Sequence, residues 1–207
     1  MDIVFTIGHS NHEITDLVAL IKKHKVDMIL DVRSTPYSKR YPQYNQEEFR
    51  LVLQSHQIDY QSFGLWFGAR QPDPEYYTSE GWLHYSAYAK SGTFADGVHS
   101  LDQCLFQGYS PALLCSEKDP FDCHRAIMVA RDLSQKGYDI RHILADGSIL
   151  SQAELDQQIL NKYFPNRDEG NIFDLIDGRQ SEEEMLQEAY LERNKAIAWR
   201  RDDLEAQ

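Results

Sequence analysis

The feature of this 207-residue chain that most constrains its fold is a regular alternation of short apolar runs with longer segments of helical periodicity. Buried strands are indicated by apolar or β-branched runs at residues 3–7, 28–33, 58–63, 112–115 and 139–144. A β-α-β order implies parallel strands joined by right-handed crossovers. The pattern therefore predicts an α/β fold in three layers, a mostly parallel sheet with helices on both faces, plus a C-terminal helical appendage.

Helices are predicted between these strands, at residues 14–25, 47–57, 94–107, 121–137 and 151–164. Two of them begin with the pattern of a capping box, Asn45 with Glu48 and Ser151 with Glu154. Residues 64–92 are rich in Gly, Pro and aromatic residues and show weak periodicity. For that segment we expect a long functional loop with at most one short helix.

Pro165 marks a predicted boundary between an α/β domain at residues 1–164 and an acidic helical C-terminal extension at residues 165–207. From residue 166 onward the extension has twelve Asp and Glu residues against six Arg and Lys residues. An apolar stripe at helical spacing is formed by Met185, Leu186, Ala189, Tyr190 and Ile197. We expect a helix that packs back on the domain or mediates oligomerisation, and a solvated tail is the alternative.

Charge and cysteine usage exclude several classes of protein. The formal net charge of −12 disfavours a broad basic face for duplex DNA, although a local cationic pocket could still hold a small anion. The opening "MDIVFTIGHS" lacks a basic and an apolar leader region, and no run approaches the ~18 apolar residues of a membrane span. The odd set Cys104, Cys115 and Cys123 lacks a C-x-x-C pair. We expect a cytoplasmic protein with reduced thiols, no membrane partner and no assigned metal or cofactor.

Polar side chains follow three of the predicted strands at the point where each strand ends. They are His9 and Ser10 after the first strand, Asp31, Arg33 and Ser34 around the end of the second, and Cys115, Glu117 and Lys118 at the end of the fourth. Ligands of open parallel sheets bind beyond the carboxyl ends of the strands. If these strands are neighbours, the three groups meet at one rim and form a site.

The segment "LLCSEKDPFDCHR" at residues 113–125 carries the most reactive of these groups. Asp119 as cap and Pro120 at the first position would place Cys123, His124 and Arg125 early in a helix, where the dipole favours negative charge. A thiol in that field is more acidic than usual. Cys115 is then a candidate nucleophile or polarising group, with His9 or His124 as base. The alternative is that both thiols are buried packing residues.

The remaining candidates bind an anion or assist catalysis. Arg33, Arg125 and Lys118 are the predicted anion ligands, because a guanidinium or ammonium group pairs with phosphate. Ser10, Ser34 and Cys123 are placed beside them, and Arg70 lies in the long loop, from which it could close over the site. Asp31 and Glu117 are assigned to the catalytic group. A structural ion pair between Asp31 and Arg33 is the alternative for those two residues.

Several motifs in this order resemble a known family: "TIGHSN", "DVRSTPYSKRYPQYNQEEF", "IDYQSFG", "WLHYSAYAKSGTF", "LLCSEKDPFDCHR" and "HILADG". The chain resembles the domain of unknown function family 488 over about residues 1–150. The resemblance implies a compact α/β domain of bacteria and archaea without an established activity. It also implies signature polar positions at Gly8, His9, Ser10, Asp31, Arg33, Ser34, Cys115, Glu117, Cys123, His124 and Arg125.

Three functions remain open from the sequence. The leading hypothesis is an enzyme, a thiol- or histidine-dependent hydrolase or transferase that acts on a phosphate-bearing small molecule or nucleotide. The second is a non-catalytic module that binds nucleotide or nucleic acid and needs the arginines but not the thiols. The third is a metal-binding protein that uses Cys115, Cys123, His124 and His9. It ranks last because neighbouring helical residues, as predicted for 123 and 124, diverge by about 100°.

Overall fold

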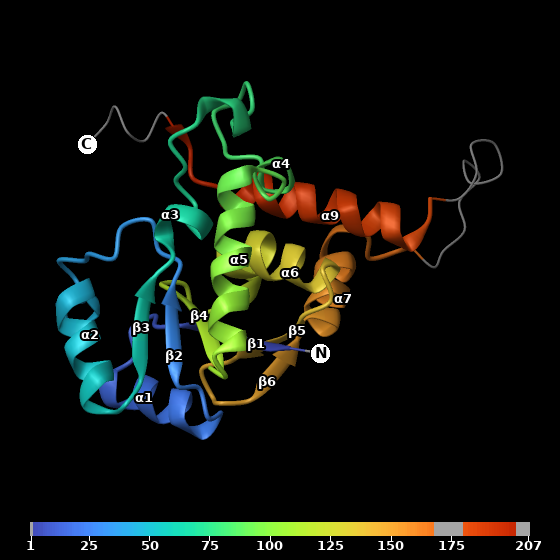
Figure 1. The fold of residues 1–207 in the computed structure, drawn as a ribbon. Coiled ribbons are helices and arrows are strands. Elements are labelled where there is room, and N and C mark those ends of the chain that lie inside the picture. The colour runs from blue at the N-terminus through green and yellow to red at the C-terminus, as the bar shows by residue number, and fades with distance from the viewer. Residues whose placement is uncertain (1, 168–179, 202–207) are drawn as a thin grey trace.

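The computed structural model describes residues 2–167 and 180–201, and these build one six-stranded sheet with helices around it (Figure 1). The strand order is β3-β2-β4-β1-β5-β6, and only the β5–β6 pair is antiparallel. The strands are β1 (Ile3–Gly8), β2 (Met28–Asp31), β3 (Asp59–Ser62), β4 (Pro111–Cys115), β5 (Asp139–Ile143) and β6 (Ile149–Ser151). The predicted α/β fold with a mostly parallel sheet is confirmed, although the short edge strand β6 was not predicted.

Helices of very different length connect the strands. The α-helices are α1 (Ile14–Lys23), α2 (Gln46–Ser55), α3 (Gly64–Phe67), α4 (Tyr85–Tyr88), α5 (Gly92–Phe106), α6 (Arg131–Gln135), α7 (Gln152–Tyr163) and α9 (Glu182–Ile197). Tighter or wider turns are the 3₁₀ helices η1 (Pro42–Tyr44), η2 (Pro74–Tyr76) and η3 (Pro120–Asp122) and the π-helix η4 (Arg125–Ala130).

The two faces of the sheet bury separate apolar clusters because neighbouring residues of a strand point to opposite faces. Val4, Leu30 and Leu113 belong to one cluster, which α5, α6, α7 and α9 cover. Phe5 and Leu114 belong to the other cluster, which α1 and α2 cover. Figure 1 shows α1 and α2 on one side of the sheet and the other long helices on the opposite side. The sheet is thus the middle of three layers.

Of the two predicted capping boxes, the structure contains one. The Ser151 hydroxyl accepts the Glu154 N–H at the start of α7, and the Glu154 carboxylate accepts the Ser151 N–H in return. At α2 the box predicted from Asn45 and Glu48 is wrong, because the Asn45 side chain makes no cap. Its Oδ1 instead accepts the Ser38 N–H at 2.7 Å, so it ties down the preceding loop.

The helix predicted from residue 121 does not begin there. Asp119 accepts the Phe121 N–H and closes only the short turn η3, after which Cys123 is extended, with φ −129° and ψ 136°. The helix starts at His124, and the Cys123 carbonyl accepts the N–H groups of the residues at 126 and 127. Cys123 therefore precedes the helix rather than lying within it. The first turns of this helix are π-helical, a geometry that often marks functional sites.

The predicted C-terminal extension contributes α9, whose apolar stripe packs against α7 and η4. Met185, Ala189 and Tyr190 are buried there, and Leu186 and Ile197 pack against the same cluster. Residues 168–179 and 202–207 of the extension lie outside the described residues. Among the helices that are described, none combines the length and apolar content needed to cross a membrane.

Candidate functional site

The polar groups at the strand ends meet because β2, β4 and β1 are neighbours in the sheet. Gly8 lies opposite Cys115, and Asp31 lies opposite Leu114. Backbone hydrogen bonds continue past the strands, from the His9 N–H to the Cys115 carbonyl at 2.9 Å. The convergence inferred from topology is therefore present in the structure.

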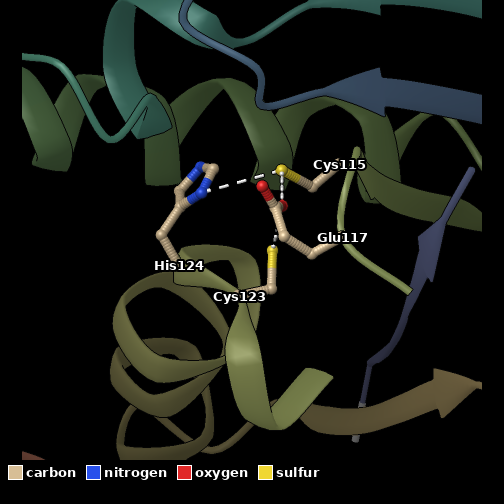
Figure 2. A group of neighbouring side chains, drawn as sticks. All are labelled: Cys115, Glu117, Cys123 and His124. Carbon is tan, nitrogen blue, oxygen red and sulfur yellow. Dashed lines mark hydrogen bonds between the residues drawn. The ribbon is translucent and has the colours of Figure 1, made fainter. Parts of the chain in front are cut away.

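Four side chains from this rim converge on one point: Cys115 at the end of β4, Glu117 in the following loop, and Cys123 and His124 at the start of the next helix (Figure 2). The Oε2 atom of Glu117 lies 2.9 Å from the Cys115 sulfur and 3.0 Å from the Cys123 sulfur. The Cys115 sulfur is 3.6 Å from Nδ1 of His124. One donor atom from each residue lies within 4.8 Å of the other three.

The extended backbone of Cys123 brings its side chain and that of His124 to the same point. The reason for ranking a metal site last, that the two side chains diverge on a helix, does not hold in this geometry. Cys115, Cys123 and His124 are 2%, 1% and 8% exposed; Glu117 as a whole residue is exposed, but its carboxylate points inward to both sulfurs. This set of two sulfurs, an imidazole nitrogen and a carboxylate matches the ligands of zinc.

The imidazole of His124 is held in one orientation by the neighbouring strand. Its Nε2–H donates to the Val32 carbonyl at 3.1 Å, because a carbonyl can only accept. In the neutral ring this fixes Nδ1 as the nitrogen with a free lone pair, aimed at the sulfurs. A histidine whose second nitrogen donates to a carbonyl is also the usual arrangement of a metal ligand.

Arg125 supports the loop rather than facing solvent. Its guanidinium is fully buried and donates to the carbonyls of Glu117 at 2.7 Å and Lys118 at 3.2 Å, while its backbone N–H donates to the Cys123 sulfur at 3.4 Å. The loop passes so close to β1 that a Cβ atom on Gly8 would lie 1.8 Å from the Glu117 carbonyl oxygen. Arg125 therefore fixes the backbone that carries two of the four donor groups.

The four groups do not titrate independently. Burial, together with the Cys123 sulfur, raises the pKa of Cys115 well above its usual value, and burial likewise raises the pKa of Glu117. Burial opposes charge at Cys123 too, but the Cys115 hydrogen bond and the Arg125 charge hold its pKa well below the usual value. Burial also disfavours charge on His124, yet its Cys123 contact raises the pKa. The ionisation of each group therefore depends on its neighbours in the cluster.

Asp31 and Arg33 form a buried ion pair on the other side of the rim. The Arg33 guanidinium donates to the carboxylate through Nε at 2.9 Å and Nη2 at 2.6 Å, and the Tyr60 hydroxyl donates to the same carboxylate at 2.8 Å. Burial opposes the charge of Arg33, but Asp31 outweighs it and raises the pKa of the guanidinium. The ion-pair alternative describes this geometry, and Nη1 is the edge of Arg33 that Asp31 does not engage.

His9 lies beside this pair and not beside a thiol. Its Nδ1–H donates to the Ser10 carbonyl at 3.0 Å, and its Nε2 accepts from Nη1 of Arg33 at 3.3 Å. The ring stacks on Tyr44 with centroids 4.1 Å apart. Burial and the Arg33 charge lower the pKa of His9 to about 4, so the ring is neutral at physiological pH. Its lone pair is engaged by Arg33.

A pocket of about 310 Å³ opens above the rim. It is lined by Arg33, Ser34, Thr35, Ala69, Arg70, Tyr85, Cys115, Ser116, Glu117, Asp122, His124, Ile197 and Trp199. Six of the residues predicted from sequence are in this lining: Arg33, Ser34, Arg70, Cys115, Glu117 and His124. Four others lie behind it: His9, Asp31, Cys123 and Arg125. Ser10 and Lys118 are outside the lining, and the Ser10 hydroxyl donates a hydrogen bond to the Asn11 side chain.

Three of the site residues that were not predicted bear on its chemistry: Tyr60, Tyr85 and Trp199. Tyr60, on β3, is the second partner of Asp31, and its place beside β2 follows only from strand order. Tyr85 lines the pocket from α4, inside the segment expected to be a loop. Trp199 follows α9 and comes from the extension. Strand pairing and long-range packing place all three, and no local pattern marks them.

The comparisons with known proteins give one finding. The family model for the domain of unknown function DUF488 matches residues 13–131, more than half of the chain. No curated protein and no solved structure matches it. The matched range includes β2, β4 and all four converging side chains, whereas β1, α7 and α9 lie outside it. The chain belongs to the DUF488 family of domains of unknown function.

Proposed function

We propose that this chain binds one zinc-like transition metal ion through Cys115, Glu117, Cys123 and His124, and that it is an enzyme acting on a phosphate-bearing small molecule in the pocket above. The observation that carries the proposal is the convergence of four donor atoms within 4.8 Å of one another. Zinc binds four ligands tetrahedrally, with sulfur at about 2.3 Å and nitrogen or oxygen at about 2.0 Å. The four residues supply the number and kinds of donor atom that such an ion would need.

The surroundings of the four ligands support a metal as well. The Val32 carbonyl orients His124, and the Arg125 N–H donates to the Cys123 sulfur. Protein metal sites commonly contain hydrogen bonds of this kind, which orient the side chains that bind the ion. Two thiolates and a carboxylate around a divalent cation carry one excess negative charge. The buried guanidinium of Arg125 offsets that charge.

The site is open on one side, as a catalytic metal site must be. Cys115, Glu117 and His124 line the pocket, whereas Cys123 lies behind them. A bound zinc ion would polarise a phosphoryl oxygen and lower the pKa of a bound water. Glu117 is the member of the four whose residue is exposed, so it would be the ligand able to exchange with water or substrate and to take up the proton of the water.

Arg33 supplies the contact for the substrate's anionic group. It lines the pocket, and Asp31 holds two of its nitrogens rigidly. Nη1 points away from that carboxylate and carries two hydrogens; His9 accepts one of them, and the other is the donor for the anion. A rigid guanidinium beside a metal is the combination that enzymes use to hold phosphate.

The absence of a disulfide among the three cysteines is compatible with the reducing cytoplasm that we propose as the location of the protein.

The experiment is elemental analysis of the purified full chain, made without a metal-affinity tag. We expect about one zinc ion per chain in the wild-type protein, and almost none in Cys123→Ser or His124→Asn. Cys104→Ser is the matched control, because Cys104 is a buried cysteine on α5 whose sulfur donates to Gln61 and which is not one of the four converging residues. Glu117→Gln changes an exposed ligand and should weaken metal binding without unfolding the chain. A folded wild-type protein that retains no zinc after incubation and dialysis would contradict the proposal.

Direct catalysis by a thiol is a second candidate, favoured by one observation. Cys115 lines the pocket with its sulfur 3.6 Å from Nδ1 of His124, a distance compatible with a nucleophile and its base. Alkylation separates the two candidates. If a metal is bound, a chelator should greatly accelerate alkylation of Cys115. If the thiol itself is the nucleophile, Cys115 should react at the same rate with and without chelator.

A further inference from the structure

The outer wall of the pocket comes from a part of the chain that lies outside the family match. Ile197 ends α9, and Trp199 follows it two residues later; both line the pocket. The family match ends at residue 131. The extension thus supplies part of the same cavity that Cys115, Glu117 and His124 line.

Backbone contacts fix this segment in place. Arg200 pairs with Trp82 as an antiparallel bridge, and the Arg201 N–H donates to the Gly81 carbonyl at 2.9 Å. One turn earlier, the buried Asn194 side chain donates to the Leu83 carbonyl at 3.0 Å and accepts the Tyr85 N–H at 2.9 Å. Trp199 is therefore held on both sides by hydrogen bonds to residues 81–85.

Trp199 carries a guanidinium over its ring. The Arg70 Cζ atom lies 5.2 Å from the indole centroid, and Tyr77 meets the indole edge-on with centroids 6.4 Å apart. Arg70 is exposed and forms no ion pair with any residue that the structure describes. Its backbone N–H donates to the Ser34 hydroxyl at 2.9 Å, so the side chain starts from a fixed point. The Arg70 guanidinium and the Trp199 indole therefore lie against each other in the lining of the pocket.

We infer that the pocket has two parts, an inner anion-binding part at Arg33 and an outer ring-binding part at Trp199 and Arg70, so that its substrate is a phosphate ester carrying a flat aromatic ring. Trp199 is then a specificity-determining residue. The inference rests on the proposed function, because it places the phosphate beside the metal ligands. It adds the chemical class of the group that the phosphate is attached to.

The size of the expected effect follows from stacking. A base stacked on an aromatic side chain raises affinity by roughly five- to 150-fold. The ring should therefore improve affinity by about tenfold or more. A plain phosphate ester without a ring gains nothing from Trp199, so the two kinds of ligand separate the roles of the two parts.

The experiment compares methyl phosphate with phenyl phosphate, which present the same phosphate group and differ in the ring. Titration calorimetry on the metal-loaded full chain should give phenyl phosphate about a tenfold or greater advantage. Trp199→Ala should reduce that advantage to near unity and leave the affinity for methyl phosphate unchanged. Trp199→Phe should retain most of it. Thermal unfolding of each variant shows that the C-terminal segment is still folded.

Two results with the wild-type protein would overturn the inference: equal affinity for the two esters, or binding of neither. Two results with Trp199→Ala would also overturn it: a preference for phenyl phosphate that survives, or an equal loss of affinity for both esters. Zinc content measured on the same samples separates this failure from that of the proposed function. A protein without zinc contradicts the proposed function. A zinc-loaded protein without a ring preference contradicts the inference alone.

Discussion

The two halves of the pocket floor are built on opposite principles. On the β2 side, Asp31 and Arg33 neutralise each other, and Tyr60 donates to the same carboxylate. On the β4 side, two thiols, a carboxylate and an imidazole crowd together with no arginine or lysine among the four residues. The first half balances its charges with protein groups alone, and Arg33 reaches the pocket with an Nη1 edge that Asp31 does not engage. The second half is arranged to receive a cation, which is why we assign binding of the metal there and binding of the anion to Arg33.

The difference begins in the backbone. Asp31 and Arg33 are two residues apart, and the Asp31 carboxylate accepts both the backbone N–H and the guanidinium of Arg33, so this pair forms within one short segment. Cys115 and Cys123 are eight residues apart and meet only because the chain turns at η3 and becomes extended at Cys123. Arg125 then fastens the intervening loop through the carbonyls of Glu117 and Lys118. The ion pair on the β2 side thus forms between two nearby residues, whereas the cluster on the β4 side forms only when the loop between Cys115 and Cys123 is folded.

The largest effect on stability is expected on the paired half, from Asp31→Asn. This substitution leaves the guanidinium of Arg33 buried without a countercharge, and breaking such a pair costs about 3–5 kcal/mol. Chemical denaturation of the wild-type and variant proteins measures the free energy of unfolding. Zinc content should stay near one ion per chain where the variant is folded, because Asp31 is not a ligand.

Asp139→Asn is the matched control for that substitution. Asp139 also pairs with an arginine two residues away, but Arg141 is 41% exposed and Asp139 is 32% exposed. An exposed pair contributes at most about 1 kcal/mol. If Asp31→Asn cost no more than Asp139→Asn, the buried pair would not be the structural half of the site. Loss of zinc from a folded Asp31→Asn protein would show that the two halves depend on each other.

A smaller effect is expected from His142, which lies behind the metal half. It accepts from the Thr6 hydroxyl and donates to the Gln152 side chain, and Thr6 in turn accepts from Arg125. Burial, with the Arg125 charge, lowers the pKa of His142 to about 3. In the unfolded chain a histidine has a pKa of about 6.5. Below that pH the His142 imidazole binds a proton in the unfolded chain but not in the folded chain. The free energy of unfolding therefore falls as the solution becomes more acidic.

The expected loss at this residue is about 2 kcal/mol between pH 8 and pH 5. His142→Asn removes the titrating ring. The unfolding free energy of the wild-type protein minus that of the variant should therefore decrease by about that amount from pH 8 to pH 5. A difference that stays constant with pH would mean that His142 is not held neutral beside Arg125.

The sequence alone predicts the layers and the rim, because apolar runs and helical periodicity are local properties. It also predicts which strand ends carry polar groups, and ten of the twelve assigned site residues lie in or directly behind the pocket. The conformation of Cys123 was mispredicted because an aspartate followed by a proline begins a 3₁₀ turn as readily as an α-helix. Trp199 was not predicted because its position depends on pairing between residues 81–82 and 200–201. Asn45 shows the same limit, since Ser38 competes for its side chain.

X-ray absorption spectroscopy at the zinc edge, on the purified full chain, tests the metal assignment most directly because it reports which atoms surround the ion. We predict a first shell of two sulfur atoms at about 2.3 Å and two nitrogen or oxygen atoms at about 2.0 Å. Cys123→Ser should lose that signal, and Cys104→Ser should keep it. A shell of nitrogen and oxygen alone would place the zinc elsewhere on the protein and contradict the assignment.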